Sequence, residues 1–300
     1  MKIIKRTLIA ALILFSFALF GGAWYFSSVL MYTKVSSCKP EHYVFCNDPK
    51  IDLGLDFENI ELHTKDGFTL SAWYIPSKQK SSKAVISIHG RGATRREGLR
   101  FVKAIHELGI NVIMPDLRNC GESQKSFSSM SYHERKDVES AYNYLKEVKK
   151  MNSIGILGFS MGAATSIIFM AEHPDIKVGI FDSGFSDFYD VITINAKNDY
   201  GLPKYPLLPI VSLLYELRGN LNLNEMSPKA YIGKISPRPV LILHGTADVT
   251  VPYSMGQELY ENAKNPKELI TIKDGRHTRL WQKDPDLIKK KVQEYYGKYL

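Results

Sequence analysis

Short apolar runs alternate with longer amphipathic segments over most of the chain from residue 57 onward. Two stretches of alternating apolar and polar residues, 57–64 and 68–75, flank Lys65-Asp66-Gly67 and predict an antiparallel hairpin. Six apolar runs follow, and they predict strands at 84–89, 111–115, 154–158, 178–182, 240–244 and 268–272. Because strands that alternate with helices need crossover connections, we expect an α/β fold with a mostly parallel, eight-stranded sheet covered on both faces.

The intervening segments predict helices up to Leu108, over 132–149, directly after Ser160, over 254–263, and from Asp284 to near the C-terminus. Asp284-Pro285 suits the start of the last helix, whose buried face is predicted to carry Leu287, Ile288, Val292 and Tyr295. The 300 residues are 44% hydrophobic and show no internal repeat, which favours one folded domain over 57–300.

The longest interval between predicted strands, 184–235, predicts a small cap inserted before the seventh strand. Its apolar segment 206–215 is capable of forming a helix. If this segment belongs to a cap, it lines an apolar acyl pocket; if it packs into the core, it does not. The sequence leaves both possibilities open.

The first 33 residues predict a membrane segment. Leu8 to Tyr32 carries no charged side chain and is long enough to cross a bilayer as a helix. Basic residues within the first six favour a cytoplasmic N-terminus, so the rest of the chain is expected on the extracytoplasmic side. Two alternatives stay open: Leu8 to Phe20 forms the core of a cleaved signal peptide, so that the protein is secreted, or the segment is a buried helix.

Residues 34–56 form a polar stub between this segment and the predicted domain, and the stub contains Cys38 and Cys46. An oxidising compartment would let the two cysteines pair, whereas two free thiols are the alternative. The sequence has no Cys-x-x-Cys pair, His-Glu-x-x-His motif or EF-hand spacing. We therefore expect neither a metal nor another cofactor.

Ser160 stands at the centre of Gly158-Phe159-Ser160-Met161-Gly162, between a predicted strand and a predicted helix. A Gly-x-Ser-x-Gly turn in this position holds the serine in a strained backbone conformation and exposes its hydroxyl above the sheet. The glycines let the strand and the helix pass close together. A chance occurrence is the alternative, but the flanking strand and helix favour a nucleophile.

A serine nucleophile needs a base and an acid, and two later loops supply candidates. Asp248 follows the predicted strand 240–244, and a carboxylate there can orient a histidine. Asp182, at the end of an earlier strand, is the rival acid. His277 is the only histidine that follows Asp248, so it alone completes the chain order Ser, Asp, His and is the candidate general base.

Two further loops end strands at the same edge of the predicted sheet. In the loop at 90–92, the backbone N–H of Arg91, together with that of Met161, can form an oxyanion hole. The same loop resembles half of a dinucleotide fingerprint but lacks the third glycine. In the other loop, Asp116 and Arg118 are interpreted as buried ionic support, and Cys120 is expected near the mouth of the site, where it can be modified.

Taken together, these motifs resemble those of the alpha/beta hydrolase family, in particular its membrane-anchored bacterial members similar to serine aminopeptidase-like hydrolases. The resemblance covers about 57–300. It rests on His89-Gly90, Asp116-x-Arg118-x-x-Gly121-x-Ser123, Gly158-x-Ser160-Met161-Gly162, His244-Gly245-x-x-Asp248-x-x-Val251-Pro252 and Gly275-x-His277. It departs from the family where Asn119-Cys120 replaces the more usual Gly-His pair, which affects the expected shape of the pocket.

The resemblance implies the alpha/beta hydrolase fold with Ser160 as nucleophile, His277 as base, Asp248 as acid, and the N–H groups of Arg91 and Met161 as oxyanion donors. It implies acyl transfer through an acyl-enzyme, with cleavage of a carboxylic ester, thioester or lipid acyl bond. Serine peptidase or amidase activity is an alternative, and so is a non-catalytic member of the fold that binds a ligand.

The net charge of +8 raises the question of a negatively charged partner. Basic residues gather near 91–100 and at 289–291. Such runs most often form a solvated face, but an anchored enzyme can also use them to face anionic headgroups or to attract an acidic substrate. No nucleic-acid-binding module accompanies the charge, so nucleic acid is not expected. The expected partners are a small-molecule or lipid acyl substrate and, through the N-terminal helix, a membrane.

Overall fold

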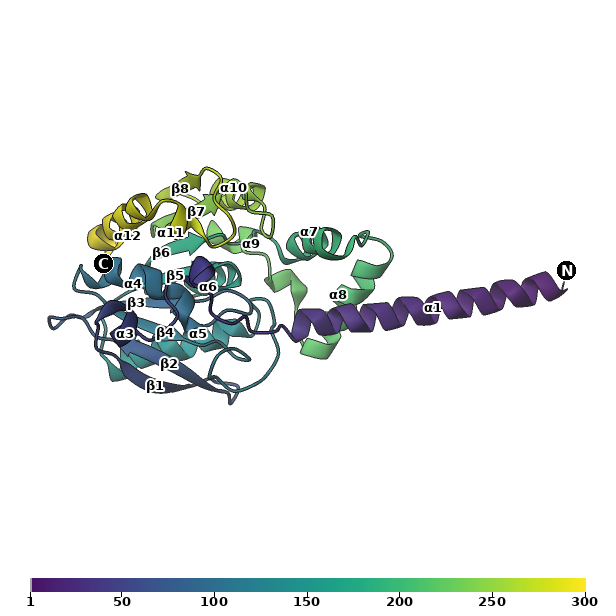
Figure 1. Ribbon diagram of the computed structural model, residues 1–300, viewed down its shortest axis with the longest axis horizontal. Helices are drawn as coiled ribbons and strands as arrows, with labels where there is room; N and C mark the ends of the chain where they lie inside the picture. Colours follow the sequence, from purple (N-terminus) through teal and green to yellow (C-terminus); the bar gives the residue numbers. More distant parts are fainter. Residues whose placement is uncertain (1) are drawn as a thin grey trace.

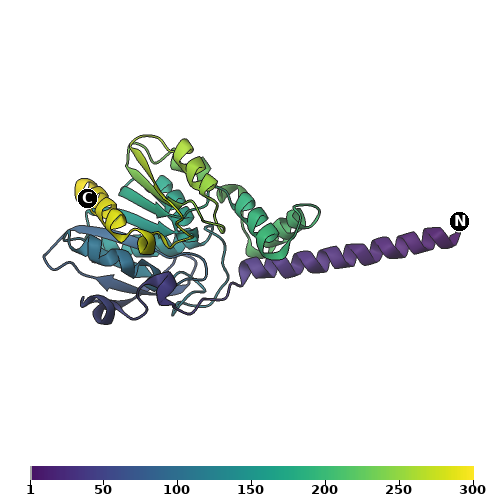
Figure 2. The same cartoon turned by 45° about the horizontal axis from the view of Figure 1, so that its top comes forward.

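A single twisted sheet runs through the centre of the molecule in the computed structural model, which describes residues 2–300 (Figures 1 and 2). Its strand order is β1-β2-β4-β3-β5-β6-β7-β8. From β4 through β8 every pair of neighbours is parallel, while β2 runs antiparallel to both β1 and β4. The eight strands are β1 (Glu58–His63), β2 (Thr69–Ile75), β3 (Lys83–Ile88), β4 (Asn111–Pro115), β5 (Ser153–Phe159), β6 (Ile176–Asp182), β7 (Val240–Gly245) and β8 (Lys267–Ile272). The predicted mostly parallel, eight-stranded sheet is confirmed.

Helices cover both faces of the sheet because the parallel strands need crossovers. One face is covered by α5 (Glu134–Asn143), α6 (Met161–Glu172) and α10 (Tyr253–Asn262), and the other by α4 (Leu99–His106) and α12 (Pro285–Tyr299). Side chains along β3 alternate between the two cores: Ile86 and Ile88 pack on the first face, and Val85 packs on the second. The strands are therefore apolar on both sides, as the continuous runs in the sequence predict.

Several helix boundaries differ from those predicted. The segment before Leu108 first forms a 3₁₀ turn, Arg95–Gly98, and only then α4. The helix predicted over 132–149 begins at Glu134 and ends in a π-helical turn, Tyr144–Val148. Asp284 caps α12 as predicted, accepting a hydrogen bond from the N–H of Leu287 at 3.1 Å.

The interval between β6 and β7 contains α7 (Phe188–Tyr200), α8 (Leu207–Gly219), a 3₁₀ turn (Leu223–Glu225) and α9 (Lys229–Ile232). The helix expected over 206–215 is confirmed by α8, whereas the sequence analysis missed α7. The short α9 packs on α6 and α10. In contrast, α7 and α8 stand out from the sheet and lie beside the N-terminal helix (Figures 1 and 2). We call α7 and α8 the cap.

The N-terminal helix α1 (Lys2–Met31) projects far beyond the body of the protein (Figure 1). It is long and apolar enough to cross a membrane, although length and composition do not distinguish an anchor from a signal sequence. Its last turns pack against the cap, where Ala23, Ser27 and Met31 are buried. The stub that follows contains two short helices, α2 (Pro40–Tyr43) and α3 (Pro49–Leu53).

Candidate active site

Ser160 lies at the turn between β5 and α6, with φ +52° and ψ −118°. A non-glycine residue at positive φ is strained and is held there by its surroundings. The glycines on either side permit the turn. A Cβ at Gly158 would lie 2.4 Å from the carbonyl oxygen of Gly162, and one at Gly162 would lie 2.3 Å from that of Ile88. The predicted sharp turn is therefore present, and the close approach of strand to helix explains both glycines.

The structure brings Ser160, His277 and Asp248 together from the loops after β5, β8 and β7. His277 Nε2 lies 2.9 Å from Ser160 Oγ, and His277 Nδ1 lies 2.7 Å from Asp248 Oδ2. The other oxygen of Asp248 accepts hydrogen bonds from the backbone N–H groups of Thr250 and Val251, at 3.0 and 2.8 Å. The carboxylate is thus fixed on both oxygens, and it can hold the imidazole in the tautomer that accepts a proton at Nε2.

Asp182, the rival acid, makes no hydrogen bond to His277 within the described chain. It is fully buried at the end of β6, where Oδ1 accepts the hydroxyl of Ser183 at 2.8 Å and Oδ2 has no hydrogen-bond partner. Burial raises the pKa of its carboxyl to about 6. Its backbone carbonyl accepts the N–H of Ser160 at 2.8 Å, so Asp182 supports the turn through its main chain.

The two backbone N–H groups expected to form an oxyanion hole belong to residues next to Ser160 or next to its neighbour Gly90. Met161 is the first residue of α6, and its N–H points out of the helix N-terminus. Gly90, the neighbour of Arg91, lies against the nucleophile, because a Cβ at Gly90 would lie 3.2 Å from that of Ser160. Within residues 2–300, neither N–H donates a hydrogen bond. Both predicted donors are therefore free to bind a developing negative charge.

The Arg91 loop is held by Glu97, which the sequence analysis did not single out, and by His89, which it named only as part of a motif. Glu97 Oε2 accepts the N–H of Gly90 at 2.7 Å. The ring of His89 bridges two loops, because Nε2 accepts the N–H of Leu117 at 2.9 Å and Nδ1 lies 2.7 Å from the carbonyl of Gly90. The His89-Gly90 motif was visible in the sequence, but its role needs both partners, which only the folded chain reveals.

Charged side chains hold the loop after β4, as predicted, although Asp116 and Arg118 do not form an ion pair with each other. Asp116 accepts the N–H groups of Arg95 and Glu122, at 2.7 and 3.0 Å. Arg118 forms ion pairs with Asp137 and Asp66. The expectation that Cys120 is open to modification is wrong: it is only 7% exposed, and burial raises the pKa of its thiol to about 12.

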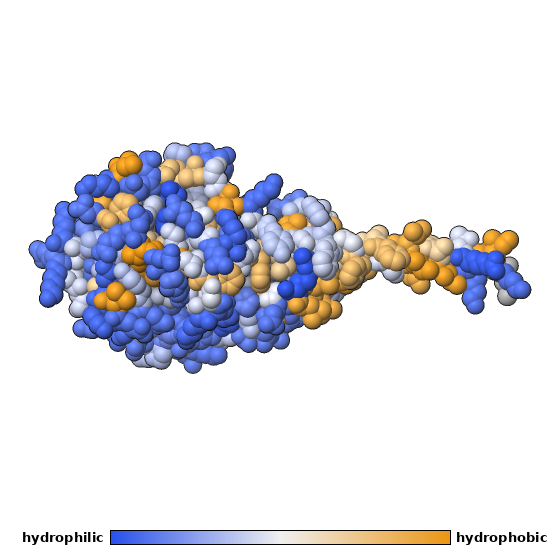
Figure 3. All heavy atoms as spheres, turned by 90° about the horizontal axis from the view of Figure 1, so that it is seen from below, coloured by the Kyte–Doolittle hydropathy of each residue, from blue (hydrophilic) through white to orange (hydrophobic). Residues whose placement is uncertain are grey.

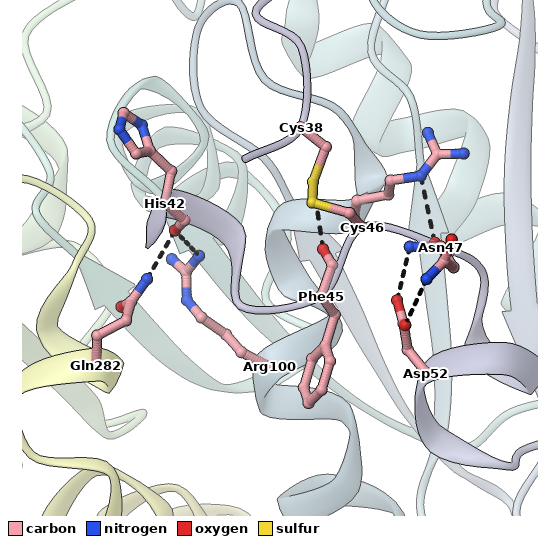
Figure 4. The surroundings of a disulfide bond; sticks show 9 residues. Cys38, His42, Phe45, Cys46, Asn47, Asp52, Arg100 and Gln282 are labelled. Atoms are coloured by element: carbon pink, nitrogen blue, oxygen red, sulfur yellow. Dashed lines mark hydrogen bonds between the residues drawn. A yellow bond between two sulfur atoms is a disulfide. The ribbon is translucent and has the colours of Figure 1, made fainter. Parts of the chain in front are cut away.

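Cys38 and Cys46 form a disulfide (Figure 4). The loop that it closes is docked on the domain, since the carbonyl of His42 accepts a hydrogen bond from Gln282 Nε2 at 2.8 Å and another from Arg100 at 3.4 Å. The stub is therefore more than a linker.

A groove of about 600 Å³ next to His277 is lined in part by His42, Arg276 and Arg279. A second groove of about 560 Å³ shares Val249 and Thr250 with it and is also lined by Arg91. A cavity of about 120 Å³ shares Arg91 with this second groove and extends beneath the cap, where its lining includes Leu208 and Val211 of α8. The described residues contain no group of three or more His, Cys, Asp or Glu side chains that could hold a metal ion.

Residues 83–210 match the alpha/beta hydrolase fold family. An uncharacterized protein of Bacillus subtilis, YqkD, is 30% identical over 249 residues, which are 80% of this chain and 81% of YqkD. The chain belongs to the alpha/beta hydrolase family. The hydrolase is also similar to the solved esterase Pf2001 of Pyrococcus furiosus, with 27% identity, a TM-score of 0.70, and coverage of 89% of this chain and 99% of the esterase. A lysophosphatidylserine lipase of Danio rerio, ABHD12, is 27% identical over 205 residues, 66% of this hydrolase and 51% of the lipase.

Proposed function

We propose that this hydrolase is a serine esterase or lipase that cleaves a carboxylic ester, thioester or lipid acyl bond through an acyl-enzyme. The observation that carries the proposal is the unbroken line of hydrogen-bond contacts from Ser160 through His277 to Asp248. A hydroxyl, an imidazole and a buried carboxylate in this order form the arrangement that activates serine in unrelated folds. The likeness to an esterase and to a lipase supports the ester class of substrate.

In the first half of the reaction, Ser160 Oγ attacks the carbonyl carbon of the substrate while His277 Nε2 takes the hydroxyl proton. The carbonyl oxygen becomes an oxyanion that the N–H groups of Arg91 and Met161 stabilise, and Asp248 stabilises the imidazolium. His277 then gives its proton to the leaving alcohol or thiol, and the acyl group stays on Ser160. In the second half, His277 takes a proton from water as the water oxygen attacks the acyl carbon, and His277 then returns a proton to Ser160 Oγ as the bond from the acyl group to Ser160 breaks and the acid leaves.

A fluorophosphonate probe tests the nucleophile, because it reacts with an activated serine and spares ordinary ones. We expect the full-length wild type to be labelled and Ser160→Ala to be unlabelled. Ser166→Ala is the matched control, since Ser166 lies on the same helix, is buried, and has a hydroxyl without a hydrogen-bond partner. If folded wild type is not labelled, the site is not catalytic and the ligand-binding alternative holds. Comparing matched ester and amide substrates then separates an esterase from the peptidase or amidase alternative.

We also propose that α1 anchors the hydrolase in a membrane, with the domain on the extracytoplasmic side. Three features support this placement: the uncharged run from Leu8 to the end of α1, the basic residues Lys2, Lys5 and Arg6 in its first turns, and the Cys38–Cys46 disulfide, because disulfides persist in oxidising compartments. Sequencing the N-terminus of the mature protein tests the anchor. A mature chain that begins near Trp24 would establish signal cleavage and a secreted protein instead.

A further inference from the structure

The end of α1 is attached to the hydrolase domain at several points. Two last-turn carbonyls, those of Val29 and Leu30, accept hydrogen bonds from Nη2 of Arg91 at 2.7 and 3.0 Å. Carbonyls in the last turn of a helix have no partner within the helix, so the buried guanidinium satisfies them and opposes the negative end of the helix dipole. The carbonyl of Met31 accepts the N–H of Ser128 at 2.8 Å.

A second arginine, from the cap, binds the same end of α1. Nη1 of Arg218 in α8 donates to the carbonyl of Trp24 at 3.2 Å and to the hydroxyl of Ser28 at 2.9 Å. Its guanidinium also lies 4.0 Å from the centre of the Trp24 ring. Ala23 and Ser27, one turn apart, are buried on this face, and such small residues allow close packing of helices. The last third of α1 is therefore packed against the hydrolase domain and hydrogen-bonded to it.

This docked end forms one wall of the cavity of about 120 Å³. Phe26, Val29 and Leu30 of α1 line the cavity, and Ile192 and Ala196 of α7 are among the residues that line it from the cap. Arg91 connects the cavity with the proposed oxyanion hole, because its backbone N–H belongs to that hole and the same residue lines both the cavity and the adjoining groove. A mostly apolar cavity that reaches the residue of the proposed oxyanion donor suits the acyl part of an ester.

With α1 anchored as proposed above, the cavity lies at the level where α1 leaves the bilayer. A span of about 20 residues crosses the hydrocarbon core, and one that begins at Leu8 ends near Ser27, within the segment that contacts the cap. Tyr200, Leu213 and Leu217 of the cap, and Tyr205 between its two helices, are all more than half exposed. Hydrophobic surface accordingly continues from α1 onto the adjoining body of the protein (Figure 3). Exposed tyrosines and leucines beside a membrane helix suit the bilayer interface.

We infer that the last two turns of α1 are part of the substrate-binding site: they form a wall of the acyl cavity, and the substrate is a membrane-borne amphiphile whose acyl chain enters along α1. This inference rests on the proposed esterase function and adds its substrate class. It makes Val29 a specificity-determining residue on an element that the hydrolase fold itself does not require. The catalytic groups remain complete when Val29 is changed, so only the fit of the acyl chain changes.

Filling the cavity from either wall tests the inference. Full-length Val29→Trp and Ala196→Trp, purified in detergent micelles, are assayed with p-nitrophenyl acetate and p-nitrophenyl decanoate. Each methylene kept out of an apolar site costs about fourfold in kcat/KM, from about 0.8 kcal/mol. Exclusion of two methylenes therefore predicts a loss of roughly 15-fold with decanoate, while kcat/KM with acetate stays within about twofold. Tyr32→Trp, just past α1 and 59% exposed, is the control and retains both activities.

Selective loss of decanoate hydrolysis in both variants supports the inference. If Val29→Trp retains decanoate activity, α1 is not a wall of the acyl site, whatever Ala196→Trp does, and the esterase proposal stands. If Val29→Trp loses fluorophosphonate labelling as well, Val29→Leu is used in its place. The inference then requires a loss of about fourfold in kcat/KM with decanoate, and retained decanoate activity contradicts it. If wild type hydrolyses neither ester and Ser160→Ala does not differ from it, the esterase proposal itself fails, which is a distinct outcome.

Discussion

Replacing Asp182 with asparagine separates the two acids that the sequence offers as partners for the histidine. Asp182 is fully buried, and among the described residues one of its oxygens has no hydrogen-bond partner, while the hydrogen bonds of His277 go to Asp248 and Ser160. Asparagine keeps the shape of the side chain and removes the charge. The backbone carbonyl that accepts the N–H of Ser160 is unaffected by the change. We therefore expect Asp182→Asn to keep kcat within about threefold of wild type and to change stability instead.

The size of the stability change follows from the pKa of the carboxyl. Burial raises this pKa from 3.8 to about 6, so the folded state binds the proton more tightly than the unfolded state does. Wild type therefore loses stability as the pH rises from about 4 to about 6, where the folded protein must accept a buried charge. Two pKa units at 1.36 kcal/mol each give about 3 kcal/mol. Asparagine does not titrate, so the advantage of Asp182→Asn grows over this interval and is constant above it.

Urea unfolding of the full chain in detergent micelles measures this effect. The fluorescence of Trp73, which is 3% exposed, reports loss of the core. Midpoints are compared for wild type and Asp182→Asn at pH 4, 5, 6 and 7. A stability difference that is the same at all four pH values would refute the idea that a strained charge is buried here. A fall in kcat of several thousandfold in Asp182→Asn would instead make Asp182 the functional acid.

Three further predictions concern the site and its supports. Asp248→Asn is expected to lower kcat by about 10⁴ with an unchanged circular-dichroism spectrum, because the imidazole loses the acceptor that fixes its tautomer; activity near that of wild type would contradict this role. Replacing Cys38 and Cys46 together by serine should remove about 2.5 kcal/mol of unfolding free energy, the loop-closure value for nine residues, and fully reduced wild type should match the double variant in urea. Gly162→Ala should abolish soluble expression, because its Cβ would lie 2.3 Å from a β3 carbonyl oxygen, whereas Gly21→Ala, with no atom within 4 Å, should express normally.

The positions of Ser160, Asp248 and His277 could be predicted from the sequence because a parallel sheet brings the carboxyl ends of its strands to one edge. Three loops that follow strands therefore meet, whatever their separation along the chain. Chain order admits both Asp182 and Asp248, and the choice of Asp248 followed from its loop, which ends in Val251-Pro252 and leads into a helix. What the order could not supply was the way in which Asp248 is fixed, since its second oxygen binds two N–H groups of its own loop.

Other features depend on long-range packing that leaves little trace in the sequence. The helix α7 was missed because Lys197, Asn198 and Asp199 interrupt its apolar pattern, although Asp187 caps its N-terminus with hydrogen bonds to two backbone N–H groups. That cap is the signal that could have revealed it. The docking of α1 depends on Arg91 and Arg218, which sequence reasoning assigned to an oxyanion loop and to a cap. Nothing in the sequence around either arginine indicates that its side chain binds the end of α1.

The strand order also has a consequence for the protein during its synthesis. β8 is one of the two edge strands and, with α12, is among the last elements to be synthesised, and α12 packs back on α4 and β6. Ser160 is thus made long before His277 exists to meet it. Under the proposed mechanism, a nascent or prematurely terminated chain carries an unactivated serine, so reactivity of Ser160 would distinguish finished molecules from unfinished ones.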